Sequence, residues 1–94
     1  MLHEERNRVS EKTVDRKRAI DSLREELEAI DWYAQRMDAT RNKELKTILQ
    51  HNMDEEKEHA AMLLEWIRRN DPHFNKMLKK KLFISGKIVA KEKK

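Results

Sequence analysis

The chain has 94 residues and a formal net charge of +4, with 43% charged residues, 37% apolar residues, one Gly, one Pro and no Cys. This size and composition are typical of one small domain of long solvated helices, and the lack of Cys excludes a disulfide framework and a thiolate metal site. No apolar run is long enough to span a membrane or to serve as a signal peptide, so we expect a cytoplasmic protein, or one enclosed within a cytoplasmic compartment.

The first predicted helix spans residues 10–38 and follows a flexible N-terminus at residues 1–9. Ser10 is a suitable N-cap, because its hydroxyl can accept a hydrogen bond from the first turn. From Ile20 onward, apolar residues recur at steps of 3 and 4, which indicates a helical packing stripe. Residues 39–43 lack this periodicity and contain cap formers, so they are predicted to form a short turn. The stripe comprises Val14, Ile20, Leu23, Leu27, Ile30, Ala34 and Met37.

The second predicted helix, residues 44–70, carries polar residues in the middle of its packing stripe. Steps of 4 and 3 alternate along this stripe, which comprises Leu45, Leu49, Asn52, Glu56, His59, Leu63 and Trp66. Burying the carboxylate of Glu56 and the imidazole of His59 without partners is costly, and a metal ion is the compensation that fits best. The alternative is a surface Glu-x-x-His motif that arises by chance in a Glu-rich helix.

The third predicted helix is short and spans residues 72–83. The segment Asn70-Asp71-Pro72 predicts a stop and a restart, with the Asp as N-cap and the Pro at the first helical position. Ser85-Gly86 is predicted to end the helix, and residues 84–94 are predicted to form a tail or a linker. One face of the helix carries Phe74, Met77, Leu78 and Leu82.

Most of the basic excess lies at this C-terminal end. It comprises Lys79, Lys80, Lys81, Lys87, Lys91, Lys93 and Lys94. Because the helical body mixes both signs of charge, and its acidic residues face the proposed metal site, we expect the protein to bind neither nucleic acid nor a membrane.

The two long helices are predicted to form an antiparallel hairpin that gathers three metal ligands. With a five-residue turn, Glu56 lies level with Glu26 on the first helix. His59 lies on the same face as Glu56, since residues three apart are neighbours on a helix. The alternative for Glu26 is that it is one of several exposed glutamates in the run 25–28.

The ligand count predicts a dimer. A di-iron carboxylate site in a four-helix bundle uses a Glu from each of two helices and a Glu-x-x-His from each of the other two. This chain supplies half of that set, and its apolar content is thin. Two chains related by a two-fold axis would supply the whole set and complete an all-α four-helix bundle, with both metals at the interface.

Three segments of the sequence closely resemble the encapsulated ferritins. They are EELEAIDWY at 25–33, HNMDEEKEHAAM at 51–62 and LEWIRRND at 64–71, and the resemblance covers most of residues 13–83. It implies an all-α, ferritin-like domain at residues 10–83, in which an antiparallel two-helix hairpin plus a short C-terminal helix complete a four-helix bundle on dimerisation. It also implies a ferroxidase that oxidises Fe(II) to Fe(III) at an inter-subunit di-iron centre.

The resemblance further implies partners and an iron-storage role. Encapsulated ferritins form an annular decamer, a ring of dimers, and act inside an encapsulin nanocompartment that receives the mineral. Members of the family reach the shell through a C-terminal targeting peptide or by fusion ahead of the shell protein. Residues 88–94 do not read as a clear targeting peptide, so either a divergent tail or a fused domain fits this chain.

The resemblance also assigns roles to individual residues. Glu26, Glu56 and His59 match the ferroxidase ligands. Trp32 and Tyr33 match aromatic residues that surround these ligands, although plain interface packing is an equal alternative for both. A last match places Glu25 and Glu28 at an acidic site through which metal enters.

A different class of function remains as an alternative. The chain would then be a non-catalytic helical oligomerisation module in which Glu56 and His59 set the register, as buried polar residues do in coiled coils. Glu26 at the matching height discriminates between the two, because register-setting does not require it.

Overall fold

The computed structural model describes residues 1–90 of the chain and contains four helical elements. A short 3₁₀ helix, η1 (Arg6–Arg8), precedes the long helices α1 (Glu11–Ala39) and α2 (Lys43–Arg69), which pack as a hairpin. A short helix, α3 (Pro72–Lys81), follows. The predicted all-α hairpin with a short C-terminal helix is therefore confirmed. Predictions for Lys91, Lys93 and Lys94 lie outside the described residues.

Capping residues set the starts of the three α-helices. The Ser10 hydroxyl accepts a hydrogen bond from the Thr13 amide at 3.2 Å, as predicted from the sequence. The Asn42 side chain accepts from the Leu45 amide at 2.9 Å and closes the short turn between α1 and α2. Asp71 accepts from the Phe74 amide at 2.9 Å, with Pro72 at the first position of α3.

The end of α3 differs from the prediction. The helix stops at Lys81, because Leu82 adopts an extended backbone with φ −92° and ψ 150°. Phe83 then has a φ of 56°, in the left-handed region that a helix cannot continue through. The predicted end at residue 83 and the role given to Ser85-Gly86 are therefore wrong.

The core of the hairpin lies near its open end, away from the turn. Val14, Ala19, Ala60 and Ile67 are the buried apolar residues of the described chain. The two alanines are small, which allows α1 and α2 to pack closely there. Arg16 joins the two helices at the same end, where its guanidinium donates to the Asn70 carbonyl oxygen with a shortest distance of 2.8 Å.

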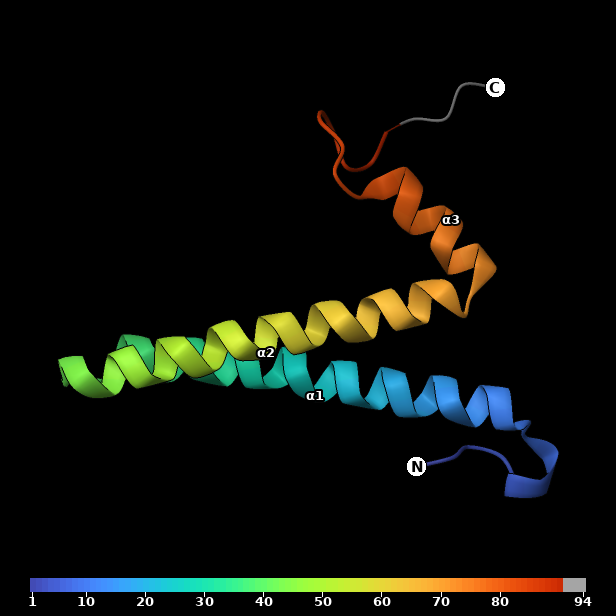
Figure 1. Cartoon of the computed structure of the whole chain (residues 1–94), viewed down its shortest axis with the longest axis horizontal. Coiled ribbons are helices and arrows are strands. Elements are labelled where there is room, and N and C mark those ends of the chain that lie inside the picture. Colours follow the sequence, from blue (N-terminus) through green and yellow to red (C-terminus); the bar gives the residue numbers. More distant parts are fainter. Residues whose placement is uncertain (91–94) are drawn as a thin grey trace.

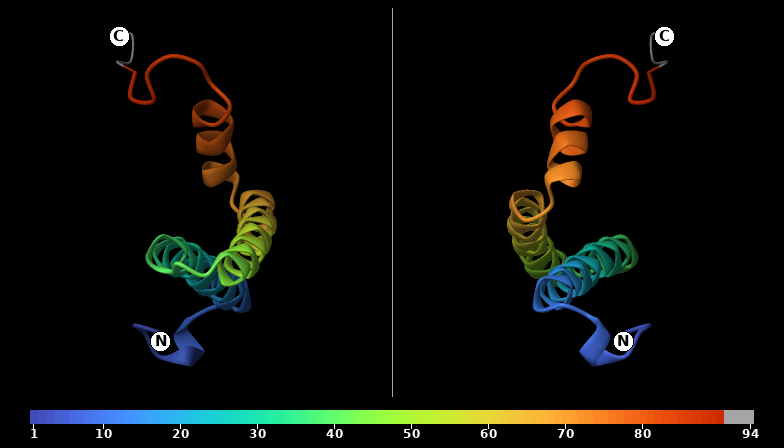
Figure 2. Two further views of the ribbon diagram at one scale, coloured as in Figure 1. Left: turned by 90° about the vertical axis from the view of Figure 1, so that its left-hand side faces the viewer. Right: turned by 90° about the vertical axis from the view of Figure 1, so that its right-hand side faces the viewer.

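Helix α3 turns away from the hairpin at this end. Figure 1 shows α3 leaving the end of α2 on one side, while the N-terminal segment lies on the other side. The two views of Figure 2 confirm that α3 extends away from both long helices. Arg68 links α3 to α2, because it donates to Asn75 at 2.6 Å while it also pairs with Glu65.

Much of the predicted apolar stripe is exposed in the single chain. Leu27 is 55% exposed and Met62 is 58% exposed, although both are large apolar residues of the long helices. Trp66 and Leu45, at the two ends of the predicted α2 stripe, are also exposed. One hairpin therefore covers only part of its own apolar surface. Among the described residues, no helix combines the length and the apolar character that crossing a membrane requires.

Candidate metal centre

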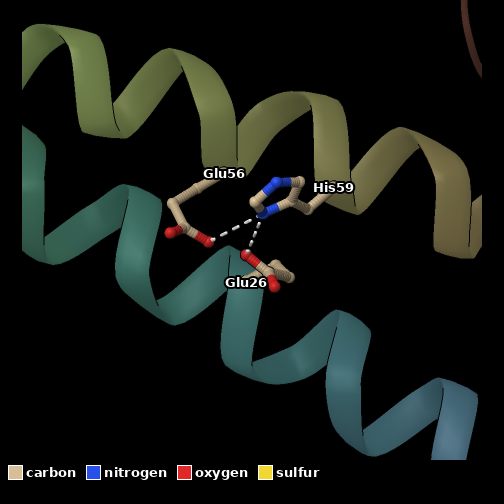
Figure 3. A group of neighbouring side chains, drawn as sticks. All are labelled: Glu26, Glu56 and His59. Atoms are coloured by element: carbon tan, nitrogen blue, oxygen red, sulfur yellow. Dashed lines mark ion pairs between the residues drawn. The ribbon is translucent and has the colours of Figure 1, made fainter.

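Three potential metal ligands converge at the middle of the hairpin, as predicted. Glu26 comes from α1, whereas Glu56 and His59 come from adjacent turns of α2, and Figure 3 shows the three side chains pointing toward one another. One ligand atom from each residue can be chosen so that all three lie within 4.8 Å of one another. The turn between the helices sets this match, because it brings mid-α1 level with mid-α2.

The imidazole of His59 lies between the two carboxylates without hydrogen-bonding to either. Its Nδ1 atom is 3.7 Å from Glu26 Oε2 and 3.7 Å from Glu56 Oε2. These separations exceed the usual hydrogen-bond length, so neither carboxylate is satisfied by the ring. They are compatible with three donor atoms that face one cation.

Burial makes this arrangement costly unless a cation is bound. The Glu26 side chain is 23% exposed and that of Glu56 is 24% exposed. Glu26 Oε2 is itself a buried atom with no hydrogen-bond partner within the described part of the chain. Glu26 is therefore not one of the exposed glutamates that the alternative reading required. A buried carboxylate oxygen without a donor favours a bound cation.

The donor set fits iron. Carboxylate oxygen and imidazole nitrogen are the ligands of non-haem iron, manganese and zinc sites, whereas thiolates are absent from this chain. The His59 side chain remains 45% exposed, so the cluster is open on the His59 side. Three protein donors with an open side are fewer than a closed iron site needs, and this leaves room for further ligands.

The two other acidic residues singled out in the sequence lie outside this cluster. Glu25 and Glu28 are both exposed on α1, and neither belongs to the group that converges on His59. Their neighbour Glu26 faces α2, and flanking residues on a helix point in other directions. Their role at a site through which metal enters stays a prediction.

The two aromatic residues near the turn gather around an arginine instead of the carboxylates. The guanidinium carbon of Arg36 lies 5.9 Å from the centroid of the Trp32 ring and 5.9 Å from that of Tyr33. Trp32 is exposed and Tyr33 is half-buried. This cation–π contact was not predicted, although the i,i+4 and i,i+3 spacings to Arg36 were visible in the sequence.

An ion-pair network at the end of α2 was also missed. Glu65 accepts hydrogen bonds from Arg68 and Arg69, which lower the pKa of its carboxyl from 4.5 to about 2. The sequence feature that could have predicted this network is the i,i+3 and i,i+4 spacing of one acidic and two basic residues. The network holds the α2–α3 corner and lies apart from the metal cluster.

Comparisons with known proteins show which family the chain is similar to. The model of the EncFtn-like family matches residues 1–85 of the chain. A crystal structure of a protein from Nitrosomonas europaea is similar with a TM-score of 0.90 and 60% identity, covering 95% of this chain and 98% of that one.

Curated relatives are also similar. The encapsulated ferritin-like protein of Rhodospirillum rubrum is 57% identical over 96% of this chain, which spans 64% of that protein's length. The encapsulin nanocompartment cargo protein EncC of Myxococcus xanthus is 55% identical over 54% of this chain, which spans 39% of that protein's length. The chain thus spans less than two thirds of the length of both relatives.

Proposed function

The chain belongs to the EncFtn-like family, and from this premise we propose that it is a ferroxidase that oxidises Fe(II) to Fe(III) at a di-iron centre between two copies of the chain. The observation that carries the proposal is the convergence of Glu26, Glu56 and His59 around a carboxylate oxygen that is buried without a donor. Fe(II) is the substrate of this centre.

The proposed centre needs a second copy of the chain. One hairpin offers a Glu from α1 and a Glu-x-x-His from α2, which is half of a di-iron carboxylate set. A two-fold axis beside the open face of His59 would bring an identical half-set opposite the first. The exposed apolar residues along both long helices support such a contact, because burying them removes them from water. Such dimers would associate into the annular decamer.

The ligand chemistry explains the direction of the reaction. Hard anionic carboxylates stabilise Fe(III) more than Fe(II), so Glu26 and Glu56 favour the oxidised product. As a ligand, the imidazole of His59 would add a neutral donor and would keep each iron distinct from an all-oxygen mineral site. The two Fe(II) ions of one centre would each give up one electron, and one dioxygen reaching the open side of the cluster would take up both electrons with two protons from water and leave as hydrogen peroxide.

Residues around the centre complete the proposal. Glu25 and Glu28 would draw hydrated Fe(II) toward the interface through their negative potential, with their counterparts in neighbouring chains. Trp32 and Tyr33 would surround the centre once the second copy is in place. Their contact with Arg36 lies within α1 of one chain, and plain packing at the interface is the equal alternative for both.

The proposed setting is an encapsulin nanocompartment in the cytoplasm. The names of the relatives in Rhodospirillum rubrum and Myxococcus xanthus describe encapsulated or cargo proteins. By analogy, the chain would associate with an encapsulin shell protein, which receives the oxidised iron for storage. Co-purification of the protein with purified shell protein would test this partner.

A direct test combines metal analysis with an Fe(II) oxidation assay on the purified protein. We expect bound iron at one ion per chain, so that each dimer holds two, and an Fe(III) absorbance that rises with time under air. The rival function, a non-catalytic oligomerisation module, predicts a stable oligomer with no metal and no oxidation above the rate of free Fe(II). That outcome would overturn the proposal.

A further inference from the structure

Asn52 is the polar residue of the α2 stripe that the proposed metal centre leaves without a role. It lies one turn before Glu56 and two turns before His59, so the three side chains share one face of α2. Apolar Leu49 and Met53 flank it. The Asn52 side chain is half-buried, yet it makes no hydrogen bond to any described residue.

Glu56 also lacks a donor that would fix its carboxylate. Within the described part of the chain, its carboxylate is approached by His59 Nδ1 at 3.7 Å, which is too long for a hydrogen bond. Carboxylates that bind metals are ordinarily held by a further hydrogen bond to the oxygen that leaves the metal free. Glu56 therefore needs a donor on the same face, and the carboxamide of Asn52 lies within one helical turn of it.

The reach of such a bond is shown elsewhere on α2. Gln50 Nε2 donates to Asp54 Oδ1 at 2.9 Å across the same i,i+4 spacing. A carboxamide four residues before a carboxylate is thus in hydrogen-bonding range on this helix. The acceptor Asp54 is exposed and Gln50 is half-buried, and their hydrogen bond is open to solvent, whereas Asn52 and Glu56 lie on the face that the second copy would cover.

We propose that Asn52 is a positioning residue for the metal centre. Its Nδ2 group donates to the Glu56 carboxylate when the metal is bound, and this bond fixes which oxygen faces the metal. The inference rests on the proposed function, because it takes Glu56 as a ligand. The spacing of the ligands does not predict this role, because Asn52 acts on Glu56 and does not itself contact the metal.

The rival role for Asn52 is to set the register between two copies. A buried Asn in a coiled coil pairs with the Asn of the partner helix and selects one alignment at a cost in stability. This role concerns assembly alone. It predicts that replacing Asn52 would change the mass or the homogeneity of the oligomer and would leave the metal geometry unchanged.

Binding of Co(II), a spectroscopic stand-in for Fe(II), separates these roles. Asn52→Leu removes the donor while nearly preserving the shape, and Asn52→Gln retains a donor. Gln50→Ala is the matched control, because it removes a half-buried carboxamide from the same helix whose acceptor, Asp54, lies outside the metal cluster. We expect Asn52→Leu to weaken Co(II) binding by roughly 10- to 100-fold and to shift the visible Co(II) absorption band. Asn52→Gln should restore much of the Co(II) affinity and of the band position. Gln50→Ala should change neither the affinity nor the band.

Three results would overturn the inference. Wild-type affinity and an unshifted band in Asn52→Leu would show that Asn52 does not orient Glu56. A changed sedimentation mass with the same band would assign Asn52 to register. Equal Co(II) binding by wild type and Glu56→Ala would show that Glu56 is no ligand, so the proposed centre itself would fail. Circular dichroism of each variant checks that the helices remain formed.

Discussion

Glu26 is the residue on which the metal centre depends most, because it is the one ligand that α1 supplies. Its Oε2 atom is buried without a donor, whereas His59 stays partly open to solvent. A change at this position removes a charge that only a cation balances. Replacing Glu26 can therefore stabilise the metal-free chain, while it removes a ligand from the metal-bound protein.

At this scale we predict that Glu26→Ala, Glu56→Ala or His59→Ala each lowers the rate of Fe(II) oxidation by more than about 10-fold, because each removes a ligand. Helicity should be retained, since Ala is a strong helix former. Stopped-flow absorbance and circular dichroism measure the two properties. Glu44→Gln, an exposed change in the first turn of α2, is the control. Wild-type rates in all three variants would refute the ligand assignment.

A second residue-scale prediction concerns Glu25 and Glu28, which are exposed and lie outside the cluster. Replacing both by Ala should change the rate of Fe(II) uptake and weaken its dependence on salt, because the attraction of an exposed acidic cluster is screened by ions. The di-iron centre should still form.

Crystals of the double variant soaked in Fe(II) decide this prediction. Iron at Glu26, Glu56 and His59 would agree with a role in metal entry alone. An empty centre would mean that Glu25 and Glu28 are themselves ligands.

At the scale of the elements, side chains at the open end of the hairpin hold α1, α2 and α3 together. Arg16 donates to the carbonyl oxygen of Asn70, the C-cap residue of α2, and Arg68 reaches from α2 to α3. A cation at a helix C-terminus is favoured by the helix dipole. The Arg68 contact with Asn75 helps to fix how α3 leaves the hairpin, and neither arginine belongs to the metal cluster.

Arg16→Met should lower the free energy of unfolding by about 1 kcal/mol, because it removes two hydrogen bonds to the Asn70 carbonyl and keeps the apolar stem. Urea denaturation followed by circular dichroism measures the change. Arg18→Met is the control, since Arg18 makes only an exposed ion pair with Asp15. Equal losses in both variants would show that the capping contact contributes nothing specific.

The Glu65 network predicts a dependence of stability on pH. The pKa of the Glu65 carboxyl is lowered from 4.5 to about 2, first by Arg68 and then by Arg69. The contribution of this ion-pair network to the stability of the fold is therefore complete above about pH 4.5, and it is lost as the pH falls toward about 2.

The urea midpoint of the wild type should fall over this range more steeply than that of Glu65→Gln. The pH profiles of the two proteins should converge at the acidic end. Parallel profiles throughout would contradict the predicted role of Glu65. Glu11→Gln, another exposed glutamate that pairs with an arginine, controls for general acid effects.

At the scale of the whole molecule, one hairpin is an incomplete fold. Large apolar residues such as Leu27 and Met62 remain exposed on the long helices, and the proposed metal centre has only half of its ligands. An apolar surface of this kind ordinarily marks an interface. The ligands and the apolar stripe therefore indicate the same second copy.

We predict that the metal-free chain is not a stable, well-folded monomer and that Fe(II) promotes its assembly, because a cation neutralises carboxylates gathered at the interface. Analytical ultracentrifugation with and without Fe(II) tests this, and Mg(II) controls for a general effect of divalent charge. A folded monomer that ignores Fe(II) would contradict it.

The sequence predicted the hairpin and the cluster because both follow from local rules. The Ser10 and Asp71 caps mark where α1 and α3 begin, and the short turn between α1 and α2 places Glu26 level with Glu56. These rules act within a few residues, so they are legible without tertiary contacts. The element boundaries of α1 and α2 were accordingly predicted closely.

The rest could not be predicted because it depends on contacts between elements. The apolar pattern continues through Leu82, so periodicity alone does not reveal that α3 ends at Lys81. Periodicity likewise does not tell which edge of an apolar stripe faces α2 and which faces another chain. Ile20 and Leu27, for example, lie on the predicted α1 stripe and yet are exposed in the single chain, which the periodicity does not indicate.

The division of the ligand set between identical chains has a genetic consequence. In the proposed dimer, one substitution at Glu56 is present twice, so it removes a ligand from both irons together. If wild-type and Glu56→Ala chains were made in equal amounts and paired at random, only about a quarter of the dimers would carry two intact half-sites. A defective allele would thus impair centres built partly from wild-type chains, and its effect would be dominant.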